Sequence, residues 1–161
     1  MGCSVLFVCL GNICRSPTAH GVFQKMVSDA GLMDEIQIDS AGTGDWHLGR
    51  GPDPRSQAAA LSRAYDLSAL RARQVCAEDF QKFDYILAMD NSNLRDLQEM
   101  RSGQDTCHLG LFLDFASASA VREVPDPYYG SGDGFNEVLD LVEDGARGLL
   151  ATIQRKLAEQ G

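Results

Sequence analysis

A cysteine and an arginine separated by five residues could bind and attack an oxyanion. Residues 9–16 read Cys-Leu-Gly-Asn-Ile-Cys-Arg-Ser and directly follow the apolar run Val5-Leu6-Phe7-Val8. A thiol at the base of a loop can act as a nucleophile, and a guanidinium can bind two oxygens of a phosphate-like anion at once. This spacing therefore predicts nucleophilic chemistry on an oxyanion, provided that the surrounding elements position Cys9 and Arg15.

The segments on either side of this loop predict a strand and a helix. The run 5–8 is short and wholly apolar, which is typical of a central parallel strand. Ser16 and Pro17 predict a helix start, with Ser16 as N-cap and Pro17 at the first helical position. Backbone N–H groups between a strand end and a helix start converge on one point and favour an anion there. The predicted anion-binding loop consists of Leu10, Gly11, Asn12, Ile13, Cys14, Arg15 and Ser16.

The same surroundings favour the thiolate form of Cys9. Backbone donors, a helix N-terminus and a nearby guanidinium all stabilise negative charge on sulfur, and a thiolate needs no separate base to attack. Gly11 permits a tight turn, and Asn12 tolerates left-handed dihedral angles. The hydroxyl of Ser16 is expected either to cap the helix or to hydrogen-bond the thiolate.

Length and charge limit the classes of protein to consider. The 161 residues predict a single domain covering 1–161, and the net charge of −9 argues against nonspecific nucleic-acid binding and against an anionic membrane surface. No stretch approaches the length of a transmembrane helix, so membrane insertion is not expected. A negative protein that binds an anion needs a locally positive site, which the loop and Arg15 would provide.

The cysteines indicate a reducing compartment. Their number is odd and no signal-peptide pattern begins the chain, so a cytoplasmic location is expected. No paired Cys/His spacing resembles a zinc site, and neither a metal nor a cofactor is predicted. The five cysteines are Cys3, Cys9, Cys14, Cys76 and Cys107.

Strand-like and helical segments alternate along the chain, which predicts an α/β sandwich with a parallel sheet. Strands are expected at 36–40, 85–89 and 108–115, and helices at 17–30, 54–64, 77–83, 94–100 and along the apolar stripe 135–157. In open α/β sheets, sites lie beyond the carboxyl ends of the strands. Cys9, the segment 40–46, Asp90 and the segment after the fourth strand are therefore expected to converge.

Asp126 is the candidate for a general acid. An ester's leaving oxygen must be protonated, and a positioned carboxylic acid can do this, typically for about 10²–10⁴ in rate. Residues 125–130 read Pro-Asp-Pro-Tyr-Tyr-Gly, in which two prolines stiffen the backbone around Asp126. Only the fold can bring Asp126 close to Cys9.

The chain resembles the low-molecular-weight protein tyrosine phosphatases throughout its length. The matching segments are VLFVCLGNICRSP at 5–17, DSAGT at 39–43, ARQ at 72–74, FDYILAMDNSNLRDL at 83–97 and DPYYG at 126–130. The resemblance implies a three-layer sandwich in which helices flank both faces of a four-stranded parallel sheet. It also implies Cys9 as nucleophile, Arg15 as transition-state clamp, Asp126 as general acid and then base, a phosphocysteine intermediate and no metal.

The resemblance further implies that Asn12, Ser16 and Ser40 support the loop. Many relatives carry a histidine two positions before the Ala-Arg pair, close to the loop asparagine, whereas this chain has Leu70 there. Either Asn12 is held by another group, or the loop is less rigid.

Three alternatives remain at this point. Arsenate reductases that depend on thioredoxin look similar in the loop, but their chemistry requires a closely spaced cysteine pair, and Cys76 and Cys107 have no such neighbour. A non-catalytic anion-binding module is the second alternative. The third is a phosphoarginine phosphatase, because some relatives act on phosphoarginine and favour threonine at the position of Ile13.

Ile13 and three aromatic residues predict a substrate with a flat ring. Trp46, Tyr128 and Tyr129 could form walls deep enough for a phenyl group above a phosphate in the loop. The expected partners are therefore phosphotyrosine-containing proteins, with inorganic phosphate or an analogous oxyanion binding in the loop. Cys14 lies in the same tight loop as Cys9, so peroxide is expected to link the two sulfurs reversibly.

Overall fold

Four parallel strands form the central sheet. The computed structural model describes residues 2–101, 103, 105–128 and 133–160. The strand order is β2-β1-β3-β4, and each neighbouring pair is parallel. The strands are β1 (Cys3–Cys9), β2 (Ile36–Gly42), β3 (Tyr85–Ala88) and β4 (His108–Leu111). The predicted four-stranded parallel sheet is confirmed.

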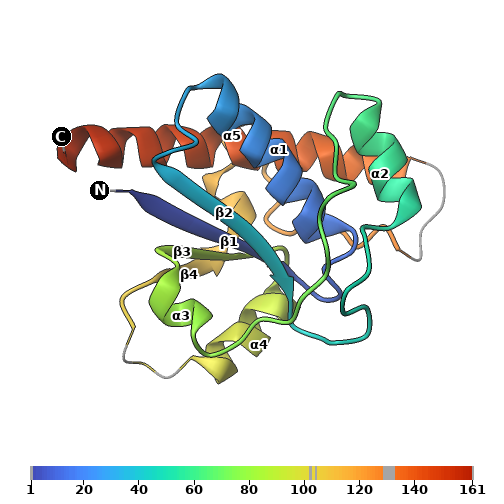
Figure 1. Ribbon diagram of the computed structural model, residues 1–161, viewed down its shortest axis with the longest axis horizontal. Helices are drawn as coiled ribbons and strands as arrows, with labels where there is room; N and C mark the ends of the chain where they lie inside the picture. The colour runs from blue at the N-terminus through green and yellow to red at the C-terminus, as the bar shows by residue number, and fades with distance from the viewer. Residues whose placement is uncertain (1, 102, 104, 129–132, 161) are drawn as a thin grey trace.

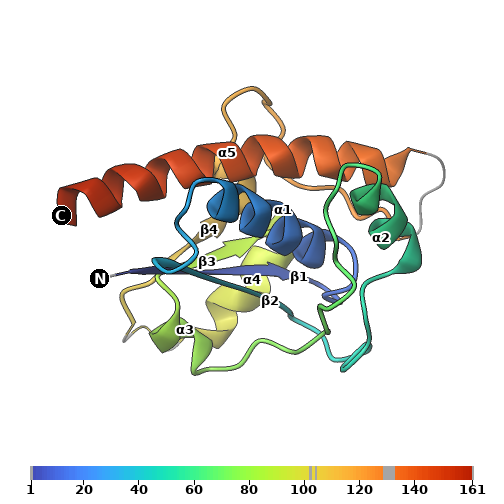
Figure 2. The same ribbon diagram turned by 45° about the horizontal axis from the view of Figure 1, so that its top comes forward.

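Helices cover both faces of this sheet, as the sandwich prediction requires. Helices α1, α2 and α5 lie on one face, and α3 and α4 lie on the other (Figures 1 and 2). Their bounds are α1 (Arg15–Asp29), α2 (Pro54–Leu61), α3 (Asp79–Lys82), α4 (Asn91–Met100) and α5 (Gly134–Gln160). The long α5 packs against α1 and α2, so these three helices form one layer on the sheet.

Strand β1 divides the core because its side chains alternate between the two faces. Val5 and Phe7 pack among residues of α1 and α5, whereas Leu6 and Val8 pack among residues of α3 and α4. All four side chains are fully buried. A strand buried on both faces is expected to be continuously apolar, which explains the run that precedes the loop.

The register of the sheet brings the predicted site segments to one edge. Cys9 is opposite Gly42 at the end of β2, and Val8 is opposite Ala88 at the end of β3. The loops that follow these three strands therefore start side by side. This is the arrangement expected for a site beyond the carboxyl ends of parallel strands.

Several predicted boundaries were wrong. The apolar run 108–115 is a strand only to Leu111, and residues 112–115 form a 3₁₀ helix, η1 (Phe112–Phe115), that buries Phe112 and Leu113. Helix α4 begins at Asn91 rather than at residue 94, because the Asp90 side chain accepts a hydrogen bond from the Asn93 N–H and caps it. Helix α2 begins as predicted, with Asp53 as N-cap, but ends at Leu61.

Gly148 allows η1 to lie directly against α5. A Cβ atom placed on Gly148 would lie 1.7 Å from the carbonyl oxygen of Phe115. Backbone cannot rotate aside as a side chain can. The close approach of the two elements therefore requires glycine at this position of a long helix.

We predict that Gly148→Ala destabilises the fold, although alanine favours helix by about 1 kcal/mol over glycine. The clash should cost more than this gain, for a net loss of about 1–3 kcal/mol in the free energy of unfolding measured with urea. Ala151→Gly, at an exposed position of the same helix, is the matched control and should cost about 1 kcal/mol. A Gly148→Ala protein more stable than the unmutated one would contradict this account.

Candidate active site

The sulfur of Cys9 lies buried at the end of β1, surrounded by hydrogen-bond donors. Its Sγ accepts hydrogen bonds from the backbone N–H groups of Asn12, at 3.3 Å, and Ser16, at 3.5 Å. The Ser16 hydroxyl lies 3.0 Å from the same sulfur. Each of these groups is positioned to stabilise negative charge on the sulfur, as the sequence predicts for a nucleophilic thiolate.

Asn12 fixes the shape of the loop. Its φ angle is +58°, in the left-handed region that asparagine tolerates. Its side-chain Nδ2 donates to Ser16 Oγ at 2.7 Å, and its Oδ1 accepts from the backbone N–H of Arg73 at 3.0 Å. Asn12 is therefore held by a backbone donor. Leu70, in the place where many relatives carry histidine, instead packs against the hydrophobic core.

Ser16 hydrogen-bonds the nucleophile and does not cap the helix. Helix α1 begins one residue earlier, at Arg15; its N-cap residue is Cys14, and no side chain caps it. The prediction of Ser16 as N-cap and Pro17 as first helical residue was therefore wrong, whereas the alternative, a hydrogen bond between the Ser16 hydroxyl and the Cys9 sulfur, is confirmed. The reason is that the Ser16 hydroxyl has other partners: Cys9, Asn12 and, at 3.4 Å, the carbonyl oxygen of Ala41.

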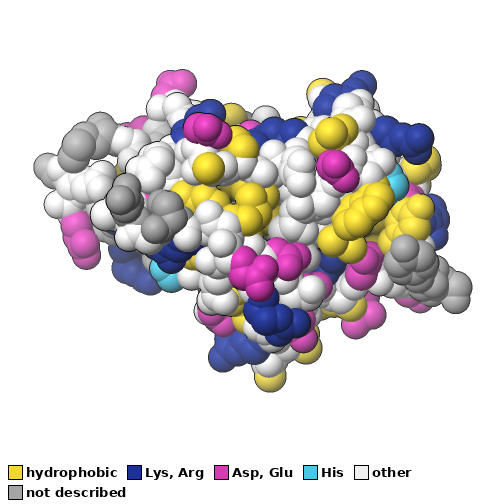
Figure 3. Space-filling view, turned by 90° about the horizontal axis from the view of Figure 1, so that it is seen from below, with side chains coloured by type: hydrophobic (Ala, Val, Ile, Leu, Met, Phe, Trp, Pro, Cys, Tyr) yellow, Lys and Arg dark blue, Asp and Glu magenta, His cyan; other side chains and the backbone are white. Residues whose placement is uncertain are grey.

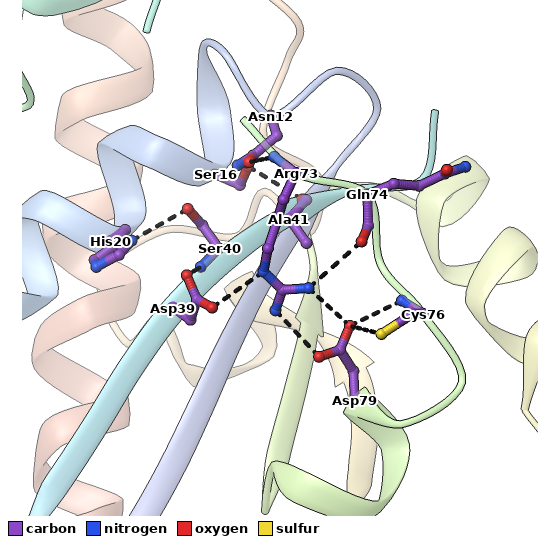
Figure 4. A network of polar contacts seen from close by, with 10 residues as sticks. All are labelled: Asn12, Ser16, His20, Asp39, Ser40, Ala41, Arg73, Gln74, Cys76 and Asp79. Atoms are coloured by element: carbon purple, nitrogen blue, oxygen red, sulfur yellow. Dashed lines mark hydrogen bonds and ion pairs between the residues drawn. The ribbon is translucent and has the colours of Figure 1, made fainter. Parts of the chain in front are cut away.

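Ser40 lies one position before Ala41 on β2, and its hydroxyl faces away from the loop toward helix α1. Its Oγ lies 3.1 Å from Nδ1 of His20, a buried residue of that helix (Figure 4). Burial lowers the pKa of His20, opposed in part by the charge of Asp39. A supporting role for Ser40 would therefore act through the β2 backbone and remains a prediction.

Arg15 joins the loop to the segments after β3 and η1. Its side chain is 3% exposed, and its Nη1 donates to the Asp90 carboxylate at 2.6 Å and to the Val124 carbonyl at 3.1 Å. Burial by itself would lower the pKa of Arg15. The charges of Cys9, Asp90 and Asp126 raise that pKa by more than burial lowers it, so the guanidinium remains charged. Sequence analysis placed Asp90 near the site but did not identify it as the anchor of Arg15.

Asp126 reaches the same pocket from the segment after η1. One of its oxygens lies 3.7 Å from Nη2 of Arg15, and the other accepts a hydrogen bond from the Tyr128 N–H at 3.0 Å. Its side chain is 35% exposed, so water and a substrate can both reach it. The fold thus brings the predicted general acid to the predicted nucleophile across 117 residues of sequence (126 − 9).

These residues line a pocket of about 450 Å³. Arg15 and Asp126 lie on its wall together with Trp46, which is 67% exposed, and Tyr128. The face drawn in Figure 3 shows apolar side chains gathered beside a histidine on one side of the molecule. The lining residues are Cys9, Leu10, Gly11, Ile13, Cys14, Arg15, Trp46, His47, Asp126 and Tyr128.

Two outcomes concern the predicted aromatic wall. Tyr129 lies outside the described residues, so its place in the wall remains a prediction. His47 was missed by sequence analysis, although it lines the pocket and its ring lies 6.2 Å from that of Tyr128. Its only sequence signal was its position directly after Trp46, in the loop that follows β2.

The second cysteine of the loop, Cys14, is buried. Burial raises the pKa of Cys14 to about 12. All five cysteines are free.

Among the described residues, no group of three or more His, Cys, Asp or Glu side chains could hold a metal ion. Within the same ranges, no helix is long and apolar enough to cross a membrane.

Comparison with known proteins identifies the family. The model of the low molecular weight phosphotyrosine protein phosphatases matches residues 4–159. The low molecular weight protein-tyrosine-phosphatase YfkJ of Bacillus subtilis is 43% identical over 153 residues, covering 95% of this chain and 97% of that protein. The chain belongs to this family.

Solved structures show the same fold. The crystal structure of YfkJ superposes with a TM-score of 0.91 at 42% identity, covering 97% of each chain. A protein tyrosine phosphatase from Entamoeba histolytica, solved with Hepes in its active site, superposes with a TM-score of 0.92 at 39% identity and covers 96% of this chain and 99% of that one. A Drosophila arginine phosphatase superposes with a TM-score of 0.86 at 34% identity and covers 92% of this chain and 96% of that one.

Proposed function

We propose that this chain hydrolyses phosphotyrosine in proteins, as well as small aryl phosphates, through a phosphocysteine intermediate. The observation that carries the proposal is the convergence of Cys9, Arg15 and Asp126 on one pocket. Membership of the phosphotyrosine phosphatase family supports it. The residue roles below are part of the proposal.

In the first step the Cys9 thiolate attacks phosphorus. The S–P bond forms while the bond from phosphorus to the phenolic oxygen breaks, and Asp126 gives its proton to that oxygen. Arg15 and the loop N–H groups bind the three non-bridging oxygens, where charge spreads in the transition state.

In the second step water releases the phosphate. Asp126, now a carboxylate, takes a proton from the attacking water, the new P–O bond forms, and the S–P bond breaks to return the thiolate. The Ser16 hydroxyl, 3.0 Å from the sulfur, can donate a hydrogen bond to the departing thiolate. The loop supplies the positive groups, and no metal takes part in the proposed mechanism.

The shape of the pocket favours an aryl phosphate. Ile13 of the loop lines it together with the aromatic residues Trp46 and Tyr128. A phenyl ring between such walls gains about 0.5–1.5 kcal/mol per aromatic contact beyond the area that it buries. The shorter phosphoserine cannot bury apolar surface there while its phosphate sits in the loop.

The alternative functions have less support. A non-catalytic anion-binding module would not need an acid in the pocket, whereas Asp126 lines it. A relay of the arsenate reductase type needs a reactive thiol pair. Cys76 is exposed, but Cys107 is buried and hydrogen-bonded to Asp105, and burial raises its pKa to about 11. The similarity to the Drosophila arginine phosphatase keeps phosphoarginine as the alternative to test.

The proposed substrate class can be tested by comparing peptides. We expect phosphotyrosine peptides to be cleaved roughly tenfold or more faster than phosphoserine or phosphoarginine peptides, since each ring contact is worth about 2- to 13-fold and two rings line the pocket. The activity should persist in excess chelator and vanish in Cys9→Ser. Ile13→Thr should shift the preference toward phosphoarginine. Ile13→Val should not, because valine has the shape of threonine without its hydroxyl. Equal rates on phosphoarginine and phosphotyrosine would contradict this assignment.

The role of Asp126 can be tested with a series of substituted phenyl phosphates. If Asp126 protonates the leaving oxygen, Asp126→Ala should slow substrates with weakly acidic phenols most, by about 10²–10⁴. In kcat/KM, which reports the first step, substrates with strongly acidic phenols should be nearly unaffected, since their oxygens depart without a proton. A uniform loss across the series would show that Asp126 acts only on structure.

We also propose that peroxide links Cys9 to Cys14. Peroxide oxidises the Cys9 thiolate to a sulfenic acid; the Cys14 thiolate then attacks that sulfur, forming the disulfide as hydroxide leaves. Both cysteines line the pocket, so peroxide can reach the pair. The raised pKa of Cys14, about 12, means that little of it is thiolate near neutral pH, so ring closure should be slow.

Disulfide closure should therefore accelerate about tenfold per pH unit between roughly pH 7 and 9, as the thiolate fraction of Cys14 rises. Stopped aliquots analysed by peptide mapping would give this rate. Cys14→Ser should lose protection against irreversible oxidation, whereas Cys107→Ser, which alters a cysteine outside the pocket, should keep it. A pH-independent closure rate would show that ionisation of Cys14 does not limit closure, and full recovery of Cys14→Ser under reductant would disprove the protective role.

Location and partners follow from the same proposal. The five free cysteines support a reducing compartment such as the cytoplasm. Proteins that carry phosphotyrosine are the proposed substrates, and inorganic phosphate is the proposed product bound in the loop.

A further inference from the structure

The Arg73 side chain is clamped between two carboxylates from different elements. Its Nη1 and Nη2 donate to the two oxygens of Asp79, at the start of α3, at 3.0 and 3.1 Å. Its Nε donates to Asp39 of β2 at 3.1 Å (Figure 4). We call Asp39, Arg73 and Asp79 the Arg73 clamp.

The clamp is built to remain charged and fixed. Burial by itself would lower the pKa of Arg73. Asp79 and Asp39 raise that pKa by more than burial lowers it, so the guanidinium stays protonated. The Asp79 side chain is 6% exposed and also accepts the backbone N–H of Cys76 at 2.9 Å. Two parallel hydrogen bonds to one carboxylate set the orientation of an arginine as well as its position.

The backbone of Arg73 contacts the loop that holds the nucleophile. The Arg73 carbonyl accepts from the Gly42 N–H at 2.8 Å, which aligns this segment with the end of β2. The Arg73 N–H donates to Oδ1 of Asn12 at 3.0 Å. Thus one residue has its side chain fixed by two carboxylates and its N–H directed at the loop.

The contacts continue from Asn12 to the sulfur. Asn12 Nδ2 donates to Ser16 Oγ at 2.7 Å, and that hydroxyl lies 3.0 Å from Cys9 Sγ. The Asn12 backbone N–H donates directly to the same sulfur at 3.3 Å. A shift of Asn12 would therefore displace two of the groups that face Cys9.

We propose that the Arg73 clamp positions Asn12 and, through it, the donors that face Cys9. The proposal rests on the proposed function, because it concerns how well the loop performs that reaction. Arg73 and Asp79 are positioning residues: Arg73 contacts the side chain of Asn12 through its N–H, and it contacts the end of β2 beside Cys9 through its carbonyl. The clamp also explains how the loop asparagine is held in a chain with Leu70 where many relatives carry histidine.

Asp79→Asn tests the clamp with little change of shape. The amide can still accept the Cys76 N–H, but it loses the charge that pairs with Arg73. Small misplacements in an active site cost up to about 100-fold in rate, so kcat/KM for p-nitrophenyl phosphate should fall about 10- to 100-fold. Glu143→Gln is the matched control. It breaks a similar ion pair, from Arg63 to Glu143 at 2.8 Å, on α5, and should leave kcat/KM unchanged.

A double-mutant cycle separates positioning from general destabilisation. If Asp79 acts through Asn12, then Asp79→Asn combined with Asn12→Ala should be no slower than Asn12→Ala alone. Glu143→Gln combined with Asn12→Ala should match the product of the two single effects. Asp39→Asn, which removes the more exposed carboxylate, provides the same cycle should Asp79→Asn fail to fold.

Two failures are distinguishable. Losses that multiply in the cycle with Asn12, or an Asp79→Asn protein as active as Glu143→Gln, would overturn the clamp proposal and leave the proposed function intact. An unmutated protein without activity on p-nitrophenyl phosphate, or a Cys9→Ser protein that keeps it, would instead overturn the proposed function.

Discussion

The placement of hydrogen-bond donors around a buried sulfur is the constraint on which the rest of this site depends. Cys9 lies at the end of a strand whose other side chains are buried on both faces, and its own side chain is also buried. The Asn12 and Ser16 N–H groups and the Ser16 hydroxyl surround its sulfur. Their positions depend on the start of α1, on the left-handed turn at Asn12 and on the Arg73 segment beside β2. A fold that failed to hold these groups would leave the sulfur without its donors.

The positive charge at the site is held in place by an acidic side chain, in a chain whose net charge is −9. Asp90 and the Val124 carbonyl hold Arg15 from one side, so its guanidinium is in place before any ligand arrives. Preorganisation of this kind avoids reorganisation when charge develops in the transition state. Asp90 therefore acts as a support for the Arg15 cation, which reconciles an acidic protein with an anion pocket.

Sequence predicted the parts of the structure that are governed by local patterns. The apolar run before Cys9, the Asp53-Pro54 helix start and the stripe of α5 each have one dominant local cause, and the structure confirms them. The convergence of Cys9 and Asp126 followed from topology together with the family resemblance.

The errors arose where a distant partner decides the local structure. Ser16 looks like an N-cap in sequence, but Asn12 and the Cys9 sulfur compete for its hydroxyl. Residues 112–115 look in sequence like the continuation of a strand, yet they form η1, which lies directly against α5 at Gly148. The Arg73 clamp joins β2 to α3 through side chains 40 residues apart in sequence (79 − 39), and no periodicity in the chain encodes such a pairing.

A covalent intermediate on Cys9 is the most direct test of this account. Asp126→Ala, mixed rapidly with an aryl phosphate whose phenol is strongly acidic, should form the intermediate normally but release phosphate slowly, because no base activates water. Acid quenching and mass spectrometry of peptides should then find one phosphoryl group on Cys9, in an amount that matches the initial burst of phenol. A burst without label on Cys9, or label on any other residue, would contradict the central claim.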